Sequence, residues 1–262
     1  MLKRPDAEIH YEVHGEGFPI LLYAPGGLRS NIEFWGPGPD GMPRIWMDPR
    51  TALADKFTVI TMDQRNAGRS VADVKPDHGW HTFAADHLAL VDHLGFEKFH
   101  VMGGCIGGSY CFEAIEQAPD RAASAVLQNP IGLHENRDTW DAAVKGYGET
   151  VRARDSSIPQ AAIDSFGHNM FGNDFVFSVS CDFVKNCKTP LFLQPGTDKA
   201  HPRPDQRRDR GAGTKSRGPE GLAWPGVPGP LDQARADVPR EAHPCLRVLR
   251  WGRATPVARS SL

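Results

Sequence analysis

One short stretch of the sequence combines a nucleophile with the glycines that could expose it. Gly103-Gly104-Cys105-Ile106-Gly107 follows the β-prone run 98–102 and precedes helix formers at 109–117. A strand, a sharp turn and a helix in this order form a nucleophile elbow, whose strained backbone lifts the central side chain above a sheet. The pentapeptide alone is a weak signal, and a glycine-rich turn with a buried structural cysteine is the alternative. The wider pattern favours Cys105 as a nucleophile.

The chemistry of a thiol at this place is acyl transfer. A helix N-terminus stabilises a thiolate through its dipole and its free N–H groups, and a thiolate is a strong nucleophile near neutral pH. Cys105 would attack the carbonyl carbon of an ester, thioester or lactone, and water would then release the acid. Such a reaction also needs a base and donors for the oxyanion.

The elements that must hold the elbow can be identified on both sides of it. A helix is predicted from Thr82, as its N-cap, to Gly95 at its C-cap. Residues 7–13 alternate in polarity and are predicted to form a hairpin with the apolar run that follows. The buried strands are predicted at 19–24, 57–62, 98–102, 122–129 and 191–193. Strands alternating with helices predict an α/β protein with a mostly parallel sheet.

The chain divides into four parts. Residues 1–131 are predicted to be the first part of the core, and residues 188–202 a returning strand with the loop that follows it. Residues 132–187 carry aromatic residues at helical spacing and predict a small helical cap, whose aromatics are expected mainly to pack within the cap. Residues 203–262 form an atypical Pro, Arg and Gly rich tail that is expected to be disordered.

The tail differs in kind from the rest of the chain. Residues 203–262 contain eleven Arg, one Lys and six acidic residues, a balance of +6, whereas residues 1–202 have a balance of −8. The tail has no Ile, Phe, Tyr, Met or Asn and shows no sustained period of 2 or 3.6. We therefore expect no regular core element there, and a sheet edge left exposed after residue 193.

Overall composition excludes several classes of function. The net charge of −2 gives no reason to expect nucleic acid, and no apolar run is long enough to span a membrane. The N-terminus has no apolar signal segment, and five irregularly spaced cysteines fit a cytoplasmic protein. No zinc-ligand spacing is present, so we expect neither a metal nor a cofactor. The expected partner is a small acyl substrate.

Four segments together resemble the α/β-hydrolase fold family. They are Pro25-Gly26-Gly27 after an apolar strand, the run 63–70 that resembles D-x-R-G-x-G-x-S, the elbow, and Gly196-Thr197-Asp198 after a late strand. The resemblance covers residues 7 to about 202. It implies an α/β-hydrolase sheet with a cap, and it leaves the substrate open because this fold serves many activities.

The resemblance also implies roles for individual residues. Cys105 matches the nucleophile and Asp198 the triad acid, while the backbone N–H groups of Ile106 and of Gly27 or Leu28 match the oxyanion hole. A cysteine in place of the usual serine is similar to the dienelactone hydrolases and the polyhydroxyalkanoate synthases, whose G-x-C-x-G-G the run 103–108 matches.

The family's histidine is not evident in the sequence. His201 lies only three residues after Asp198 and is expected not to reach Cys105, and His243 stands alone in the tail beside Pro244. A catalytically impaired or non-catalytic protein of this fold, an acyltransferase and a C–C bond hydrolase therefore stay open as alternatives. The tail composition is also what a GC-rich gene read out of frame would encode, and a basic arm for an acidic partner is a further alternative.

Overall fold

A central sheet carries the site, and the strands that meet at the elbow are parallel. The structure is a computed structural model that describes residues 1–38, 47–194, 196 and 198–201. The sheet has the order β3-β5-β4-β7-β8-β9, with β3 antiparallel to β5 and every other pair parallel. Its strands are β3 (Tyr11–His14), β4 (Phe18–Tyr23), β5 (Phe57–Met62), β7 (Phe99–Gly104), β8 (Ala122–Gln128) and β9 (Leu191–Gln194).

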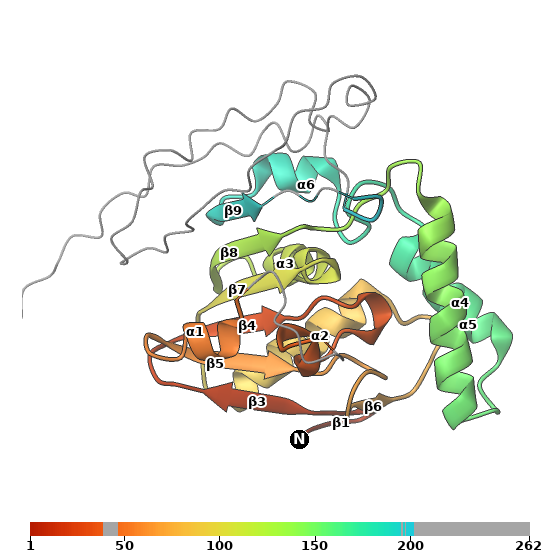
Figure 1. The fold of residues 1–262 in the computed structure, drawn as a ribbon, viewed down its shortest axis with the longest axis horizontal. Coiled ribbons are helices and arrows are strands. Elements are labelled where there is room, and N and C mark those ends of the chain that lie inside the picture. Colours follow the sequence, from red (N-terminus) through yellow and green to blue (C-terminus); the bar gives the residue numbers. More distant parts are fainter. Residues whose placement is uncertain (39–46, 195, 197, 202–262) are drawn as a thin grey trace, which may run out of the picture.

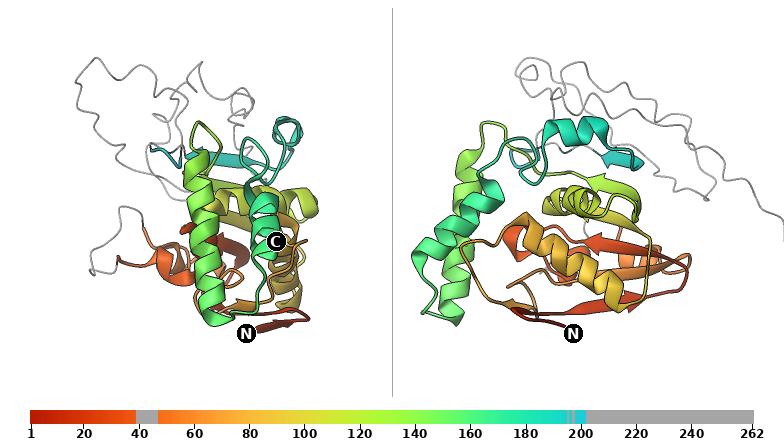
Figure 2. Two further views of the ribbon diagram at one scale, coloured as in Figure 1. Left: turned by 90° about the vertical axis from the view of Figure 1, so that its right-hand side faces the viewer. Right: turned by 180° about the vertical axis from the view of Figure 1, so that it is seen from behind.

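The strands at the centre of the sheet are apolar on both sides, because helices and loops cover both faces. Leu21 and Tyr23 of β4 point into one cluster of the core, and Ile20 and Leu22 point into the other. The first face is covered by α2 (Trp80–His93) and α3 (Ile106–Gln117), which lie in front of the strands in the right-hand view of Figure 2. The second is covered by η2 (Ile32–Trp35) and α1 (Pro49–Ala52).

The structure corrects two predictions, namely the residue at which the helix near Thr82 begins and the strand with which β3 pairs. α2 begins at Trp80, and the backbone N–H of Gly79 donates to Thr82 Oγ1 over 3.1 Å, so Thr82 caps the helix from inside its first turn. Gly95, with φ of 78°, follows the C-cap as expected. The predicted hairpin partner was wrong, because β3 pairs with β5 rather than with β4.

A small antiparallel sheet seals the end of the core next to the loop after β5. It has the order β1-β2-β6 and consists of β1 (Leu2–Arg4), β2 (Ala7–Ile9) and β6 (Val71–Ala72). Beneath it, the buried Arg65 guanidinium donates to Asp86 over 2.5 Å and to Asp6 over 2.8 Å. These bonds lower the pKa of Asp6 to about 2, against a smaller opposing effect of burial. Removing one partner of a buried charge pair is strongly destabilising, so Arg65 holds the loop against β1, β2 and α2.

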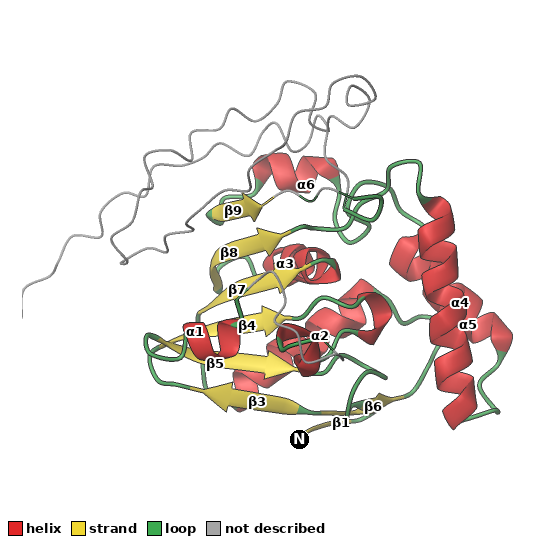
Figure 3. Ribbon diagram, in the orientation of Figure 1, coloured by secondary structure: helices red, strands yellow, loops and turns green. Residues whose placement is uncertain are grey.

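Two long helices form the cap at the carboxyl ends of the parallel strands. They are α4 (Arg137–Arg154) and α5 (Gln160–Phe171), and Figure 1 shows them beside the arrowheads of β4, β7 and β8. The Trp80 indole N–H donates to the carbonyl oxygen of Met170 over 2.7 Å, which fixes α5 on α2. Between β8 and β9 Figure 3 shows only helices and loops, and the bounds 132–187 given to the cap stay a prediction.

A short helix leads from the cap back to the sheet. The N-cap of α6 (Cys181–Asn186) is Ser180, whose hydroxyl accepts from the backbone N–H of Phe183 over 3.1 Å. β9 follows and pairs with β8. Over the described ranges, no helix is both long and apolar enough to cross a membrane. The predictions about the tail at 203–262, and about His243, lie outside the described residues.

Candidate active site

Cys105 occupies the turn between β7 and α3 in a backbone conformation that L residues rarely adopt. Its φ is 57° and its ψ −118°, while the preceding strand ends at Gly104 and the following helix begins at Ile106. The Cys105 N–H donates to the carbonyl oxygen of Gln128 over 2.9 Å, which ties the turn to the end of β8. Strained conformations of this kind cluster at functional sites. The strand, turn and helix expected from the sequence are present.

The elbow glycines are required by close backbone approach. A Cβ on Gly103 would lie 2.1 Å from the carbonyl oxygen of Gly107, and a Cβ on Gly107 would lie 2.3 Å from the carbonyl oxygen of Tyr23. Both contacts are with backbone atoms, which cannot move aside without shifting the strand or the helix. Cys105 is therefore held at the surface of the turn by two positions that tolerate no side chain.

The glycine-rich loop after β4 lies beside the elbow. The site of an added Cβ on Gly104 is 3.5 Å from Pro25 Cδ, which brings the start of the loop next to Cys105. The loop turns into η1 (Gly27–Arg29), and the Ser30 hydroxyl donates to the carbonyl oxygen of Ala24 over 2.6 Å. No atom lies within 4 Å of the Cβ position of Gly27, whose φ is 60°. The loop is thus anchored by the hydrogen bond between Ser30 and Ala24, and it leaves open space beside Gly27.

The N–H groups named from the sequence as oxyanion donors lie at the starts of two helices. Ile106 is the first residue of α3, while Gly27 and Leu28 begin η1. The first N–H groups of a helix have no acceptor within that helix. These three residues therefore stay candidates for the oxyanion hole. Ile106 lies in the elbow that contains Gly104, and Gly27 and Leu28 lie in the neighbouring loop that begins at Pro25.

Asp198 and His201 form an acid–histidine pair within one turn of chain. Nδ1 of His201 lies 2.7 Å from Oδ1 and 2.9 Å from Oδ2 of Asp198. The His201 backbone N–H also donates to Asp198 Oδ1 over 3.0 Å. Burial raises the pKa of Asp198, but the bonds from His201 outweigh it and bring the pKa below its usual range. The Asp198 side chain is 63% exposed, so water screens part of this attraction.

The same histidine faces Cys105. Burial lowers the pKa of His201, but the Cys105 side chain and then Asp198 raise it, and the net pKa is about 9. Nε2 of His201 is buried and has no hydrogen-bond partner of regular geometry within the described residues. Since Nδ1 is engaged by Asp198, Nε2 is the nitrogen left for the thiol. The expectation that His201 cannot reach Cys105 was wrong.

The expectation from the sequence was wrong for His201 because it considered only the three-residue separation of His201 from Asp198 along the chain. In the folded protein Gln194 of β9 is in register with Gln128 of β8, which is in register with Gly104 of β7. The loop after β9 therefore emerges at the same sheet edge as the elbow, about 10 Å away at the usual strand spacing. The signal that could have found His201 is its position directly after a strand end on that edge.

The run 63–70, which resembles the family's turn motif, is scaffold. Asp63 is buried and its carboxylate accepts from the backbone N–H groups of Ile32 over 2.8 Å and Arg69 over 2.7 Å. Asn66, where the resemblance leads one to expect glycine, has a φ of 61°. Its side chain bonds to Tyr147 of the cap, so this departure from the motif joins the cap to the core.

The cap aromatics pack against each other, as expected. Trp140 stacks on Phe171 with centroids 5.2 Å apart, and Phe177 meets both rings edge-on. All three are less than 5% exposed. The Ser109 hydroxyl, on α3 one turn past the nucleophile, donates to the carbonyl oxygen of Val176 over 2.8 Å. The aromatic cluster is thereby fixed to the helix that begins at Cys105.

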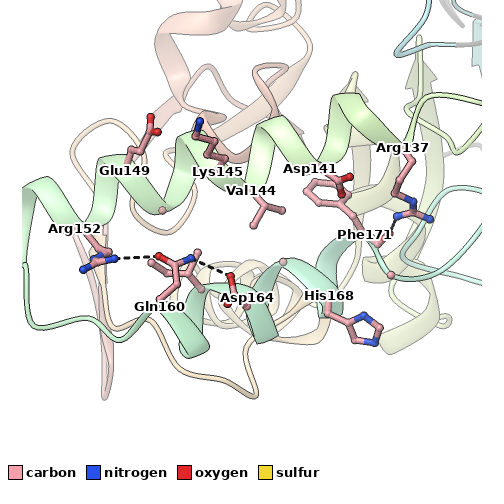
Figure 4. Close-up of a pocket in the computed structure, with 14 residues that line it drawn as sticks. Arg137, Asp141, Val144, Lys145, Glu149, Arg152, Gln160, Asp164, His168 and Phe171 are labelled. Atoms are coloured by element: carbon pink, nitrogen blue, oxygen red, sulfur yellow. Dashed lines mark hydrogen bonds between the residues drawn. The ribbon is translucent and has the colours of Figure 1, made fainter.

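A cavity of about 720 Å³ opens between α4 and α5, and it is separate from the elbow. Figure 4 shows charged side chains along its rim, with Arg152 bonded to Gln160 over 3.0 Å and Gln160 to Asp164 over 2.9 Å. None of Cys105, Asp198 and His201 lines it. Within the described part of the chain, no group of three or more His, Cys, Asp or Glu residues could hold a metal ion.

The curated relatives match about half of the chain. A protein of Azorhizobium caulinodans named "Putative carbamate hydrolase RutD" is 36% identical over 124 residues, which cover 47% of this chain and 42% of the relative. The protein of the same name from Agrobacterium fabrum is 30% identical over 162 residues, covering 60% of this chain and 54% of the relative. The chain thus spans about half the length of the curated relatives it matches.

Solved structures share the fold at low sequence identity. The meta-cleavage product hydrolase CumD of Pseudomonas fluorescens superposes with a TM-score of 0.52 at 18% identity, covering 74% of this chain and 78% of that one. The enol-lactonase of Burkholderia xenovorans superposes with a TM-score of 0.50 at 18% identity, covering 74% and 80%. The alpha/beta hydrolase fold family itself matches residues 39–206. With the elbow, the parallel sheet and the inserted cap in place, the chain belongs to the alpha/beta hydrolase fold family.

Proposed function

We propose that this protein is a hydrolase that cleaves an ester, thioester or lactone through an acyl-enzyme on Cys105. The observation that carries the proposal is the position of Cys105, in a strained turn at the N-terminus of α3. A thiol at a helix N-terminus is favoured as a thiolate, and the turn presents it to a substrate that lies between the sheet edge and the cap.

The reaction proceeds in two halves. Cys105 Sγ attacks the carbonyl carbon, and the negative charge that develops on the carbonyl oxygen is stabilised by the N–H groups of Ile106 and of Gly27 or Leu28. The leaving group departs, and water then hydrolyses the thioester. Asp198 is the acid that orients a histidine for the proton transfers. The open space beside Gly27 supports this assignment of the oxyanion hole.

The site is compatible with several classes of acyl substrate. The names of similar proteins suggest which classes to test first. Carbamates, named for the RutD relatives, present a carbonyl of the same kind to the nucleophile. Lactones, named for the Burkholderia enol-lactonase, would open without losing a fragment. Both fit acyl transfer to Cys105, and a C–C bond substrate would need a further proton transfer to carbon. We therefore place esters, lactones and carbamates first in a substrate screen.

The direct test is to trap the acyl-enzyme. The full-length protein would be mixed with p-nitrophenyl acetate and quenched in acid, and peptide mass spectrometry would locate the added acetyl group. We expect it on Cys105, with a burst of p-nitrophenol equal to the enzyme present. Cys187→Ala, which removes another free thiol, is the matched control and should leave the burst intact. Acetylation of other side chains with Cys105 unmodified would refute the nucleophile.

An acyltransferase would show the same intermediate but a different product. Adding a short alcohol or thiol as acceptor separates the two activities, because a transferase forms the new ester or thioester in preference to the free acid. A non-catalytic protein of this fold would show no burst. The strained Cys105 conformation favours catalysis over that alternative, because strain without use costs about 1–3 kcal/mol.

A further inference from the structure

We infer that His201 is the general base of the reaction, so that the acid and the base of the site lie on one four-residue segment, Asp198 to His201. The inference rests on the proposed function, because it assigns a role toward Cys105. It departs from the arrangement that the resemblance implies, in which the histidine follows a further strand. The base is then supplied by the segment directly after β9.

The first argument is the orientation of the imidazole ring. Both oxygens of Asp198 lie within 3 Å of Nδ1, which makes Nδ1 a donor and fixes the ring about its Cβ–Cγ bond. The opposite nitrogen, Nε2, is buried and has no regular hydrogen-bond partner within the described residues. A buried polar nitrogen without a partner is costly unless something uses it. The Cys105 side chain, which raises the pKa of His201, is the group to which we assign it.

The second argument is that the segment is anchored independently of its own ion pair. The side-chain amide of Asn136, which is fully buried at the start of the cap, donates to the carbonyl oxygen of Lys199 over 2.8 Å. Ala200 packs against the main core cluster, and so does Cys105. His201 thus reaches Cys105 from a backbone held by the cap and the core. Such anchoring is what a catalytic group requires.

The third argument concerns charge around His201. Cys105 and Asp198 are the two groups that raise the pKa of His201. Lys199, on the same segment, is paired with Asp138, and its Nζ lies 2.6 Å from Asp138 Oδ2. Because Asp138 and Lys199 neutralise each other, the thiol and Asp198 determine the protonation of His201. They raise its pKa to about 9 against the effect of burial, so the ring is cationic at neutral pH.

These charges define the proton transfers. In the proposed reaction the proton of the Cys105 thiol is on His201 Nε2 when Sγ attacks. Sγ bonds to the carbonyl carbon, the C–O bond to the leaving group breaks, and Nε2 gives its proton to the departing oxygen. Neutral His201 then takes a proton from water as its oxygen bonds to the thioester carbon. The C–S bond breaks, and the thiolate and the imidazolium are restored.

The test measures the reactivity of Cys105 and its dependence on pH. The rate of alkylation of Cys105 by iodoacetamide would be followed by mass spectrometry from pH 5 to pH 10 in the full chain, beside kcat/KM for p-nitrophenyl acetate. We expect His201→Gln to raise the pH midpoint of alkylation by about 1 unit or more, since the imidazolium no longer stabilises the thiolate. It should lower kcat/KM by about 100-fold or more.

Two histidine controls make the result specific. His134→Gln changes an exposed histidine at the start of the cap and should leave both readouts unchanged. His243→Gln changes the other histidine downstream of the acid, and it should also leave them unchanged. A loss that follows His243→Gln and spares His201→Gln would overturn the assignment. If His201→Gln proves unfolded by circular dichroism, His201→Asn and Asp198→Asn provide the same comparison, and unchanged midpoints in both would overturn it.

The outcomes separate this inference from the proposed function. If wild-type Cys105 forms no acetyl-enzyme, the proposed function itself fails. If Cys105 is acetylated but His201→Gln keeps the wild-type alkylation midpoint and kcat/KM, only the role of His201 fails. If both change as expected, the site is complete within the described residues, with Cys105 at the elbow and its acid and base after β9.

Discussion

The side-chain amide of Asn66 donates a hydrogen bond to the Tyr147 hydroxyl over 3.0 Å and so joins the loop after β5 to the middle of α4. The same amide oxygen accepts from the backbone N–H of Ala72 over 2.9 Å and from Arg154. One residue therefore connects the core, the small sheet and the cap. Its φ of 61° is a conformation that glycine adopts without strain, which allows the side chain to be removed cleanly.

We predict that Asn66→Gly loosens α4 while leaving the core fold in place. The bonds to Tyr147, Ala72 and Arg154 disappear, each contributing on the order of 1 kcal/mol, and the backbone keeps its left-handed conformation. Hydrogen exchange measured by mass spectrometry should become faster in α4 and stay unchanged in β7 and β8. Tyr147→Phe, which removes only one bond, should give a smaller change. Unaltered exchange in α4 would rule out a role for Asn66 in holding the cap.

Cys105→Ser should keep the fold and lose most of the activity. The C–O bond is shorter than the C–S bond and a hydroxyl is far less acidic than a thiol, so the serine oxygen would lie further from His201 and would be a weaker nucleophile. Misplacement of this kind costs on the order of 100-fold in rate. The measurements are kcat/KM and the melting temperature of both proteins. Turnover equal to or above that of the wild type would contradict a site built for sulfur.

Asp198→Asn should lower the rate with little effect on stability. The carboxylate is 63% exposed, and exposed ion pairs contribute about 0–1 kcal/mol. Without its charge the His201 ring loses both orientation and part of the raised pKa. Paired measurements of kcat and of the denaturation midpoint test this. A large fall in the midpoint with an unchanged rate would make Asp198 a structural residue.

Two glycine-to-alanine changes should have opposite effects on stability. In Gly103→Ala the new Cβ would lie 2.1 Å from a backbone oxygen, so the elbow must distort at a cost of about 1–3 kcal/mol or more. In Gly146→Ala, on α4, the Cβ meets nothing within 4 Å, and helix propensity should add about 0.5–1 kcal/mol. Urea denaturation of both variants measures the difference. Equal stability of the two would mean that the elbow is not closely packed.

Glu113→Gln should stabilise the protein above pH 7 and have little effect near pH 4.5. Burial within α3 raises the pKa of Glu113 to about 7, despite the hydrogen bond from Gln117. The folded state therefore binds the proton more tightly, and stability falls as the pH rises from about 4.5 to 7 and then stays level. Denaturation at several pH values checks this, with Glu149→Gln on the exposed side of α4 as control. Parallel pH profiles for wild type and Glu113→Gln would disprove it.

The local features of the site could be predicted from the sequence because short-range physics specifies them. The elbow depends on glycine at 103, which closely approaches Gly107 only four residues on, next to a β-prone run and a helix-forming run. Gly107 also lies against Tyr23 of β4, and that contact exists only in the folded protein. The end of α2 next to Gly95 followed in the same way, while the division of the chain into a core and a cap stays a prediction. The assignment of residues 203–262 as an irregular tail stays a prediction, as do the roles of Ile106, Gly27 and Leu28.

Three features depended on the tertiary structure alone. The partner of β3 is β5, because pairing between strands is decided by how the whole sheet closes and not by which strands are neighbours in sequence. Asn66 looked like a departure from a turn motif, and its function became visible only when α4 was placed over it. His201 was set aside for lying three residues from Asp198, yet the register of β7, β8 and β9 brings that segment to the elbow. The sequence shows which residue types are present and in what order. Whether Cys105 and His201 lie close together is decided by the sheet, because parallel strands bring their carboxyl ends together whatever the length of chain between them.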